Sequence, residues 1–180
     1  MLAQLLDAGF VAKAQVADWP IIGTLARRYG CAFIARERRG NVIGQTKAVA
    51  DQIADNRPMI LFPEGTTGCG NRLLPFRSSL FAALDGTGGG LVQPVALAYR
   101  DRAGRALSPA ALRRVAWLDD DALLPHALAL AASGGVTVEV TFEPALAPGC
   151  RKAIARHCEQ AIAARLAGSD QAAAEANRAA

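Results

Sequence analysis

The sequence predicts an α/β fold in which helices flank a mixed, largely parallel sheet. Short apolar runs that suit buried strands alternate along the chain with segments whose apolar residues recur at helical spacing. Apolar residues make up 52% of the 180 residues and aromatic residues only 6%, which suits helices packed closely on a sheet. No repeat or long linker divides the chain, so we expect one domain over residues 1–168 and a frayed tail over 169–180.

The first third of the chain is expected to alternate helices with short strands. Asp18 and Pro20 favour the start of a helix, and Gly30 favours its end. The predicted elements are, in order, a helix ending near residue 7, a strand at 10–13, a helix at 20–30, a strand at 31–35 and a helix after Gly40.

The rest of the chain continues this alternation. Residues 59–62 form a continuous apolar run, as expected of a strand buried on both faces. Residues 136–143 alternate apolar with polar side chains, which predicts a half-exposed strand. The predicted elements are, in order, strand 59–62, a glycine-rich loop at 63–76, a short helix at 78–84, a buried strand at 91–99, an irregular basic stretch at 101–116, helix 121–132, strand 136–143 and helix 150–167.

Charge and cysteine content exclude several classes of function. The net charge of +4 is compatible with nucleic acid or anionic lipid. The basic clusters at 36–39, 100–105 and 113–114 lack interleaved stacking aromatics, so we expect no nucleic-acid partner. The four cysteines form no C-x-x-C pair, so we expect reduced, inert thiols and no metal site. No apolar run reaches the roughly 18 residues of a membrane span.

A glycine-rich loop follows the apolar run at 59–62 and holds the residues that suggest chemistry. Residues 62–76 read Phe-Pro-Glu-Gly-Thr-Thr-Gly-Cys-Gly-Asn-Arg-Leu-Leu-Pro-Phe. Glycines let backbone N–H groups approach an oxyanion, and the neighbouring threonines and arginines add hydroxyl donors and positive charge. Because α/β proteins bind ligands beyond the ends of such strands, the loop predicts a phosphate or carboxylate site. An ordinary glycine-rich turn is the alternative.

A nucleotide-binding P-loop is excluded by the residues that follow the glycines. Gly65 and Gly70 have the G-x-x-x-x-G spacing, but Asn71 and Arg72 stand where a P-loop has lysine and then serine or threonine. The Leu-Leu-Pro sequence at 73–75 also disfavours a helix directly after the loop.

Short blocks along the chain resemble the glycerolipid acyltransferase family, which includes 1-acylglycerol-3-phosphate acyltransferase. Phe-Pro-Glu-Gly-Thr at 62–66 resembles its third signature block, and the extension to Arg72 is similar to that of bacterial lyso-ornithine-lipid acyltransferases. The resemblance covers about residues 9–145 and is carried by further blocks in the family order: Phe10-Val-Ala-Lys13, Trp19-Pro-Ile-Ile-Gly23, Gly30-Cys-Ala-Phe-Ile-Ala-Arg36, Leu74-Pro-Phe76, Val92-Gln-Pro-Val-Ala96 and the bacterial segment Trp117 to His126.

The resemblance implies an enzyme of membrane lipid biosynthesis. Such an enzyme moves a fatty acyl group from acyl-CoA or acyl carrier protein (acyl-ACP) to the free hydroxyl of a lysolipid, either 1-acylglycerol-3-phosphate or lyso-ornithine lipid. It uses no cofactor beyond this acyl donor, and it works at a membrane surface, on the cytoplasmic face of the bacterial inner membrane. A non-catalytic domain of the same fold that binds lipid headgroups or acts as a scaffold is the alternative.

The resemblance also assigns residues to the acceptor headgroup. Arg36 matches a family arginine, whose planar guanidinium suits phosphate oxygens. A carboxylate cannot pair favourably with phosphate, so we expect Glu64 to contact a neighbouring basic side chain or the loop backbone instead. Many family members have arginine where this chain has Thr67, and Arg72 is a candidate substitute. The predicted substrate-binding residues are Lys13 (a second positive charge), Arg36, Glu64, Gly65, Thr66, Thr67, Arg72 and Pro94 (shaping the fourth block).

The family's H-x-x-x-x-D motif does not occur in this sequence. In the family, this histidine takes the hydroxyl proton of the acceptor and the aspartate orients the histidine. Ala131 and Ile162 stand five residues after His126 and His157, so we predict no catalytic residue in the chain and structural or surface roles for both histidines. Because Met1 falls in what reads as mid-helix, we expect an N-terminally truncated domain that transfers no acyl group by itself.

Overall fold

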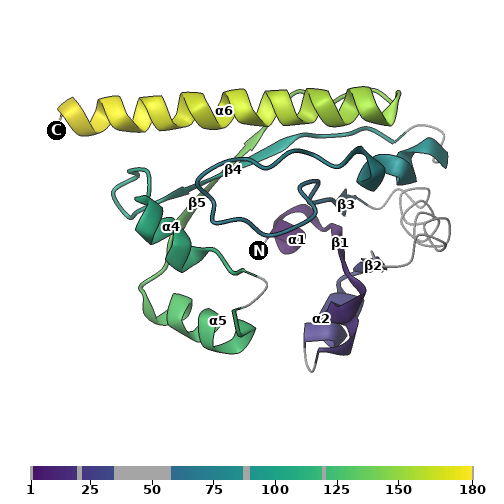
Figure 1. The fold of residues 1–180 in the computed structure, drawn as a ribbon, viewed down its shortest axis with the longest axis horizontal. Coiled ribbons are helices and arrows are strands. Elements are labelled where there is room, and N and C mark those ends of the chain that lie inside the picture. The colour runs from purple at the N-terminus through teal and green to yellow at the C-terminus, as the bar shows by residue number, and fades with distance from the viewer. Residues whose placement is uncertain (1, 20–21, 35–57, 87–89, 119–120, 180) are drawn as a thin grey trace. The chain divides into compact units, whose positions relative to one another are not determined.

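A computed structural model describes residues 2–19, 22–34, 58–86, 90–118 and 121–179 (Figure 1). Its contacts divide the chain into two compact units. The first unit comprises Met1–Pro63, Arg77–Leu91 and Ala147–Ala153, and the second comprises Glu64–Phe76, Val92–Leu146 and Ile154–Ala180. The single domain expected over residues 1–168 stays a prediction.

The first unit is built on a three-stranded parallel sheet in the order β2-β1-β3. Parallel neighbours require a crossover connection, and α2 lies in the connection between β1 and β2. The predicted helices and strands before residue 35 are confirmed, with a short 3-10 helix added. The elements are α1 (Leu2–Leu6), β1 (Gly9–Lys13), η1 (Ala14–Asp18), α2 (Ile22–Arg28), β2 (Ala32–Ile34), β3 (Met59–Ile60) and the 3-10 helix η2 (Ser78–Gly86).

Two glycines allow backbone segments of the first unit to approach closely. A Cβ atom on Gly9 would lie 2.4 Å from the carbonyl oxygen of Gly30, and one on Gly23 would lie 2.2 Å from that of Ala17. Gly30 itself has a φ of 67°, a left-handed conformation that ends α2 where the sequence predicted. The structure therefore gives a packing reason for Gly23, the last residue of the Trp19–Gly23 block.

The second unit contains an antiparallel pair of strands and three helices. β4 (Val95–Arg100) pairs with β5 (Thr137–Phe142) along its whole length. α4 (Pro109–Val115) and α5 (Leu123–Ala132) lie between these strands in the sequence, and α6 (Arg151–Ala179) follows them. The predicted helix at 150–167 is confirmed, and Ile154, Cys158 and Ile162, spaced four residues apart, are buried on one face of it. The parallel sheet and the antiparallel pair together confirm the mixed α/β class.

Two strands are shorter than predicted, and a proline lies at or near the end where each is shortened. The run at 59–62 forms a strand only over Met59–Ile60, and Phe62 is 51% exposed rather than buried. The strand predicted at 91–99 begins at Val95, after Pro94, and Leu91 is 72% exposed. A proline has no N–H to donate to a ladder, so strands tend to begin or end beside one.

Helices are more extensive than predicted. The stretch 101–116, expected to be irregular, contains α4, whose first turn has Pro109 and whose N-cap residue Ser108 accepts a hydrogen bond from Ala111 N–H at 3.3 Å. α6 extends to Ala179 and so runs into the tail that was expected to be frayed, in which six of the twelve residues are alanine, a strong helix former. The helix predicted after Gly40 lies outside the described residues. No helix in the described ranges is long and apolar enough to cross a membrane.

Candidate functional site

Carboxylates hold the predicted headgroup loop, Glu64–Phe76, at both of its ends. Glu64 is half-buried, and its carboxylate accepts a hydrogen bond from the N–H of Leu74. Glu159 on α6 accepts one from Phe76 N–H at 2.7 Å. Burial raises the pKa of the Glu64 carboxyl above its ordinary value, although the bond from Leu74 opposes that shift. Glu64 therefore contacts the loop backbone, as expected from the sequence.

Glycines set the course of the loop between these anchors. Gly65 is buried with a φ of 72°, and Gly70 has a φ of 76°, conformations that side-chain-bearing residues rarely adopt. A Cβ atom on Gly70 would lie 3.7 Å from Leu112 Cδ2, so the loop passes close to α4. The Cys69 thiol donates to Asn71 Oδ1 at 2.9 Å. The loop is thus folded against its own unit.

Three polar side chains of the loop point into solvent. Thr66, Thr67 and Arg72 are exposed. Within the described part of the chain, none of these side chains has a hydrogen-bond partner. Two hydroxyls and one guanidinium are therefore available to an anionic group from outside, and a guanidinium can bind a carboxylate or phosphate through two parallel hydrogen bonds.

The other predicted substrate-binding residues have separate surroundings. Pro94 is buried beside the start of β4, where its carbonyl oxygen accepts the N–H of Glu143 at 3.0 Å. Lys13 ends β1 in the first unit, in register with Ile34 of β2. Arg36 lies outside the described residues. All eight assignments to substrate binding remain predictions.

Neither histidine is hydrogen-bonded to a carboxylate in the described residues, although His126 lies near enough to Asp121 for an electrostatic interaction that helps to lower the pKa of the Asp121 carboxyl. His126 Nε2 lies 3.2 Å from the carbonyl oxygen of Val115, and His157 is exposed on α6. The burial of Cys31 raises the pKa of its thiol to about 11, which keeps it protonated and unreactive at neutral pH. These positions agree with structural or surface roles.

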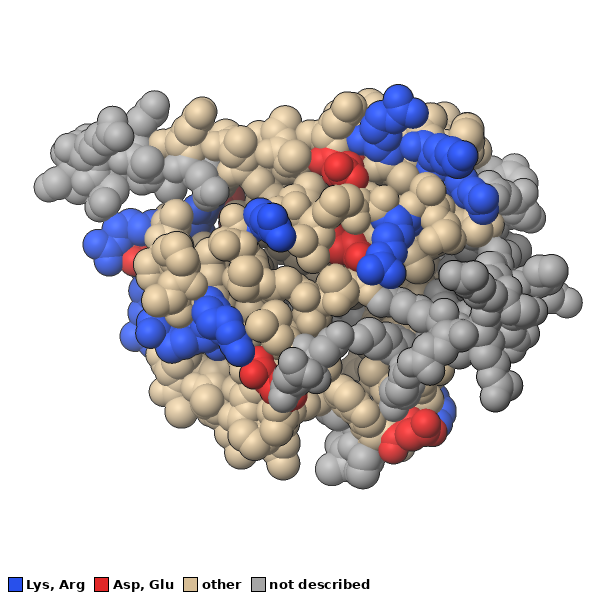
Figure 2. Space-filling model, in the orientation of Figure 1, with Lys and Arg blue, Asp and Glu red and all other residues tan. Residues whose placement is uncertain are grey.

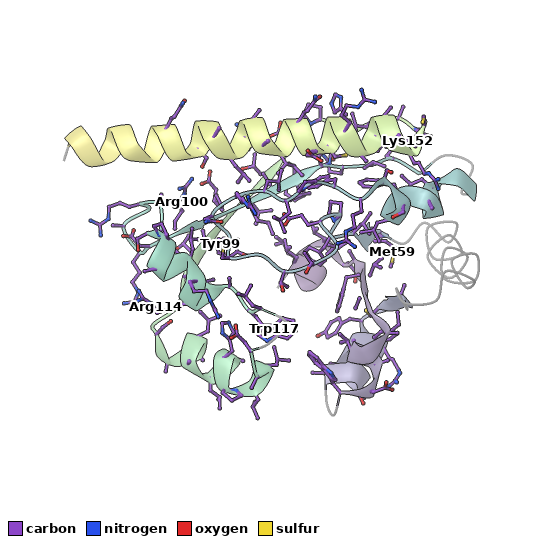
Figure 3. All side chains as sticks on the ribbon, viewed as in Figure 1. Met59, Tyr99, Arg100, Arg114, Trp117 and Lys152 are labelled. Carbon is purple, nitrogen blue, oxygen red and sulfur yellow. The ribbon has the colours of Figure 1, made fainter. Side chains whose placement is uncertain are left out.

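Sequence reasoning missed one buried cation in the second unit. Arg100, at the end of β4, is 5% exposed, and its Nε lies 3.2 Å from Glu139 Oε2 on β5 (Figure 3). Its guanidinium also donates to the hydroxyl of Ser169 on α6. Only the strand alternation, which turns Arg100 inward, distinguishes this arginine from the other basic residues of the 100–105 cluster.

Comparison with known proteins decides the family. The acyltransferase family model matches residues 2–98, more than half of the chain. The chain belongs to the acyltransferase family. All the signature blocks noted above, except the bacterial segment after residue 116, fall within the matched residues, so the resemblance is confirmed.

This acyltransferase is similar to curated relatives with two named acceptors. It is 38% identical over 175 residues to a lyso-ornithine lipid O-acyltransferase of Brucella abortus, covering 92% of this chain and 66% of the relative. A Rhizobium meliloti protein of the same name is 37% identical, covering 81% of this chain and 52% of the relative. A 1-acyl-sn-glycerol-3-phosphate acyltransferase of Neisseria gonorrhoeae is 32% identical, with 58% and 40% covered.

The chain therefore spans about half to two thirds of the length of the lyso-ornithine relatives. No solved structure matches it significantly.

Proposed function

We propose that this acyltransferase moves a fatty acyl group from acyl-CoA or acyl-ACP to the hydroxyl of lyso-ornithine lipid, at the cytoplasmic face of a bacterial membrane. One observation carries the choice of acceptor. The similarity to the Brucella abortus lyso-ornithine lipid O-acyltransferase covers 92% of the chain, and so continues well past residue 98, where the family model ends. The similarity to the Neisseria gonorrhoeae enzyme covers only 58%.

The exposed side chains of the headgroup loop support this acceptor. An ornithine headgroup presents one carboxylate and one amino group, whereas 1-acylglycerol-3-phosphate presents a phosphomonoester with up to two negative charges. Arg72 supplies a single guanidinium, and Thr67 stands where many family members have a further arginine. One guanidinium flanked by the hydroxyls of Thr66 and Thr67 matches a carboxylate in charge and in number of donors. 1-Acylglycerol-3-phosphate remains the second candidate, favoured by the Neisseria relative.

The proposed reaction needs a base that these 180 residues do not display. The acceptor hydroxyl oxygen forms a bond to the thioester carbon, the carbon–sulfur bond breaks, and the hydroxyl proton passes through the base to the leaving thiolate. Neither His126 nor His157 is followed by an aspartate at the fifth position. We therefore expect the 180-residue chain to bind the acceptor without transferring an acyl group.

The test compares the 180-residue chain with the longer product translated from any in-frame codons before Met1. Mass spectrometry follows acylation of lyso-ornithine lipid and of 1-acylglycerol-3-phosphate, with acyl-CoA and acyl-ACP each as donor. We expect the longer product to prefer lyso-ornithine lipid and the shorter chain to be inactive. Turnover by the shorter chain would contradict its inactivity, and a preference for the phosphate acceptor would contradict the choice of substrate.

The variant R72Q sharpens this test. The loss of a bidentate, charge-assisted hydrogen bond to the headgroup costs about 1.5–3 kcal/mol of binding free energy. We therefore expect kcat/KM for lyso-ornithine lipid to fall roughly 10- to 100-fold, mostly because KM rises. R156Q is the matched control, because Arg156 is exposed on α6 and has no hydrogen bond or ion pair with the loop in the described residues. Equal effects of the two variants would remove Arg72 from the site. Binding of the acceptor without turnover by any form of the protein would favour the scaffold alternative.

A further inference from the structure

Glu159 on helix α6 is bonded to the last residue of the headgroup loop. Its carboxylate oxygen Oε2 accepts the N–H of Phe76 at 2.7 Å, across 83 residues of sequence. Both residues are half-buried. A carboxylate that accepts a backbone N–H makes a charge-assisted hydrogen bond, which is shorter and stronger than a neutral one. The bond therefore attaches the end of the loop firmly to an element far along the chain.

Three hydrogen bonds close the loop where its chain returns. At the base, the N–H of Arg77 donates to the carbonyl oxygen of Pro63 at 2.9 Å. Inside the loop, the carboxylate of Glu64 accepts the N–H of Leu74. These two bonds join the loop to itself, whereas the bond from Phe76 joins it to α6. The position of the loop in its unit thus depends on Glu159.

Helix α6 can serve as a fixed support for the loop. Three apolar side chains on one face of the helix are buried, Ile154, Cys158 and Ile162. Further along, the guanidinium of Arg165 pairs with the carboxylate of Glu143, just after β5. Apolar packing and an ion pair together hold the helix, so the carboxylate of residue 159 has a defined place.

The same helix also contacts the Val92–Ala96 block through Glu143. The N–H of Glu143 donates to the carbonyl oxygen of Pro94 at 3.0 Å, and the side chain of Gln93 donates to the carbonyl oxygen of Glu143. Loop, block and this part of α6 all belong to the second unit. Helix α6 therefore links two segments whose residues are predicted to bind the substrate.

The similarity to lyso-ornithine relatives includes this helix, whereas the family model does not. The family model ends at residue 98, well before α6. The match to the Brucella abortus protein covers 92% of the chain, and it must include residue 159 wherever it begins. A contact between α6 and the loop is thus a feature of the part of the chain that resembles lyso-ornithine lipid acyltransferases beyond the family model.

We propose that Glu159 is a positioning residue for the acceptor headgroup. Its bond to Phe76 holds the loop in the course that presents Thr66, Thr67 and Arg72 together, and it does so without contacting the lipid. A loop that is already held in its binding conformation loses less conformational entropy when the ligand binds. The inference rests on the proposed function, because the loop is the predicted headgroup site.

The neighbours of Glu159 on α6 supply a matched control. Basic side chains gather over the first half of the helix (Figure 2), and Lys152 and Arg156 are exposed there. Gln160 follows Glu159 directly, is exposed, and has no hydrogen-bond partner among the described residues. Q160A therefore removes a side chain of the same length as E159A does, from the same helix, without removing a bond to the loop.

Two conservative variants separate the reach of the side chain from its charge. E159Q keeps an oxygen at the same distance from the backbone and removes the charge. E159D keeps the charge but is one methylene shorter, which withdraws the carboxylate from Phe76 N–H. A positioning role predicts that E159D is the more damaging of the two, and an effect of charge predicts the opposite. E159D also keeps the test valid if E159A fails to fold.

Amide hydrogen exchange of the 180-residue chain, followed by NMR without any ligand, tests the bond itself. We expect the Phe76 N–H to exchange about tenfold faster in E159A and E159D than in the parent. In E159Q the rate should stay within about threefold of the parent, because a neutral acceptor is weaker but present. Q160A should leave the rate unchanged.

Binding of monomeric lyso-ornithine lipid and of 1-acylglycerol-3-phosphate to the same variants tests the role. We expect the dissociation constant for lyso-ornithine lipid to rise about 3- to 10-fold in E159A and E159D, and less than about twofold in E159Q and Q160A. All variants are compared well below the urea concentration at which each unfolds, so that a loss of stability is not mistaken for a loss of binding.

Three results would overturn the inference. One is a Phe76 N–H that exchanges in E159A and E159D as it does in the parent. Another is faster exchange with unchanged binding, which would make the bond purely structural. The third is weaker binding by E159Q than by E159D. If binding depends on Glu159 as expected but favours 1-acylglycerol-3-phosphate, the choice of acceptor alone fails. A parent chain that binds neither lysolipid would overturn both proposals.

Discussion

The two compact units are stabilised internally by different means. In the first unit, backbone segments approach so closely that Gly9 and Gly23 have no room for a Cβ atom. In the second unit, arginine–carboxylate pairs join the strands to each other and to α6, as at Arg100–Glu139 and Arg165–Glu143. The first unit should therefore respond mainly to added volume, and the second to changes of charge.

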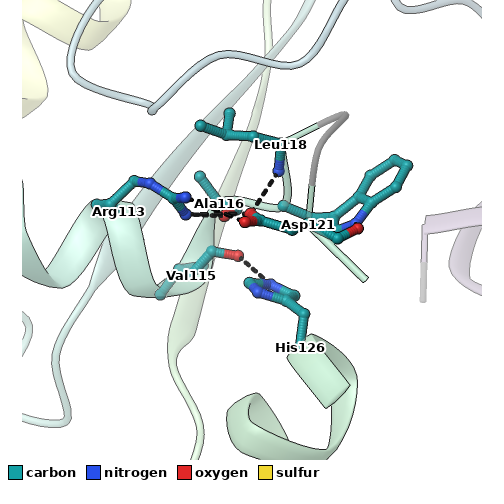
Figure 4. A network of polar contacts seen from close by, with 7 residues as sticks. Arg113, Val115, Ala116, Leu118, Asp121 and His126 are labelled. Carbon is teal, nitrogen blue, oxygen red and sulfur yellow. Dashed lines mark hydrogen bonds and ion pairs between the residues drawn. The ribbon is translucent and has the colours of Figure 1, made fainter. Parts of the chain in front are cut away.

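The difference also affects how arginine side chains are held. Where backbone segments of the first unit pack this closely, as at Gly9 and Gly23, there is no room for a side chain between them. A unit stabilised by ion pairs can hold arginines in defined positions, as at Arg113, whose guanidinium donates to both carboxylate oxygens of Asp121 (Figure 4).

The largest expected effect tests the volume sensitivity of the first unit. Gly-to-Ala changes inside helices usually stabilise by about 0.5–1 kcal/mol. In α2, however, the new Cβ of G23A would lie 2.2 Å from the Ala17 carbonyl oxygen, so we expect destabilisation of roughly 3 kcal/mol. G168A in α6 is the matched control, because nothing lies within 4 Å of its Cβ position, and it should stabilise. Urea unfolding decides, and equal signs for the two variants would remove the contrast.

A smaller effect tests the role of charge in the second unit. E139Q removes the carboxylate that lies 3.2 Å from Nε of the buried Arg100, and a guanidinium cannot shed its proton, so we expect the free energy of unfolding to fall by about 2 kcal/mol. E143Q is the control, because in this pair the carboxylate is the buried member and its partner Arg165 is exposed. The fall in the free energy of unfolding should therefore stay below about 1 kcal/mol. A larger loss for E143Q than for E139Q in urea unfolding would show that burial of the arginine is not what matters.

The smallest effect concerns pH, and two carboxyl groups of the second unit should act in opposite directions. Burial raises the pKa of the Glu64 carboxyl above its ordinary value of 4.5, so the folded chain binds this proton more tightly than the unfolded chain does. The contribution of Glu64 to stability therefore falls as the pH rises from 4.5 through the raised pKa. The hydrogen bond from Arg113, followed by that from Leu118 N–H, lowers the pKa of Asp121 below 3.8. Its contribution is therefore present above 3.8 and lost as pH falls through the lowered pKa.

Urea unfolding over about pH 3 to 7 tests both signs. The stability difference between the parent and E64Q should decrease with rising pH, and the difference between the parent and D121N should increase. E64Q keeps an oxygen that can accept from Leu74 N–H, so it isolates the charge. Slopes of the same sign would contradict the environments described for the two carboxyls.

Local chemistry explains which elements could be predicted. The helix closed by Gly30, the β5 alternation as far as Val140 and the stripe of Ile154, Cys158 and Ile162 all follow from residues a few positions apart. Phe142 departs from the alternation, since it is 49% exposed. The Ser-Pro signal at 108–109 was equally local and should have indicated α4. The loop was predictable from its glycines and Glu64, yet its second anchor was not, because Glu159 lies 83 residues from Phe76.

The sequence by itself determined the family, the order of most helices and strands, and the loop that should hold the headgroup, because signature blocks and periodic apolar residues act over short spans. Only the tertiary structure decided that Arg100 is buried and that Gly23 faces a carbonyl oxygen. It alone also brought Arg113 and Arg114 of α4 and Leu130 of α5 to one groove. These features depend on which distant segments pack together. That packing is set by the buried area and the polar contacts of a whole unit, which no short stretch of sequence contains.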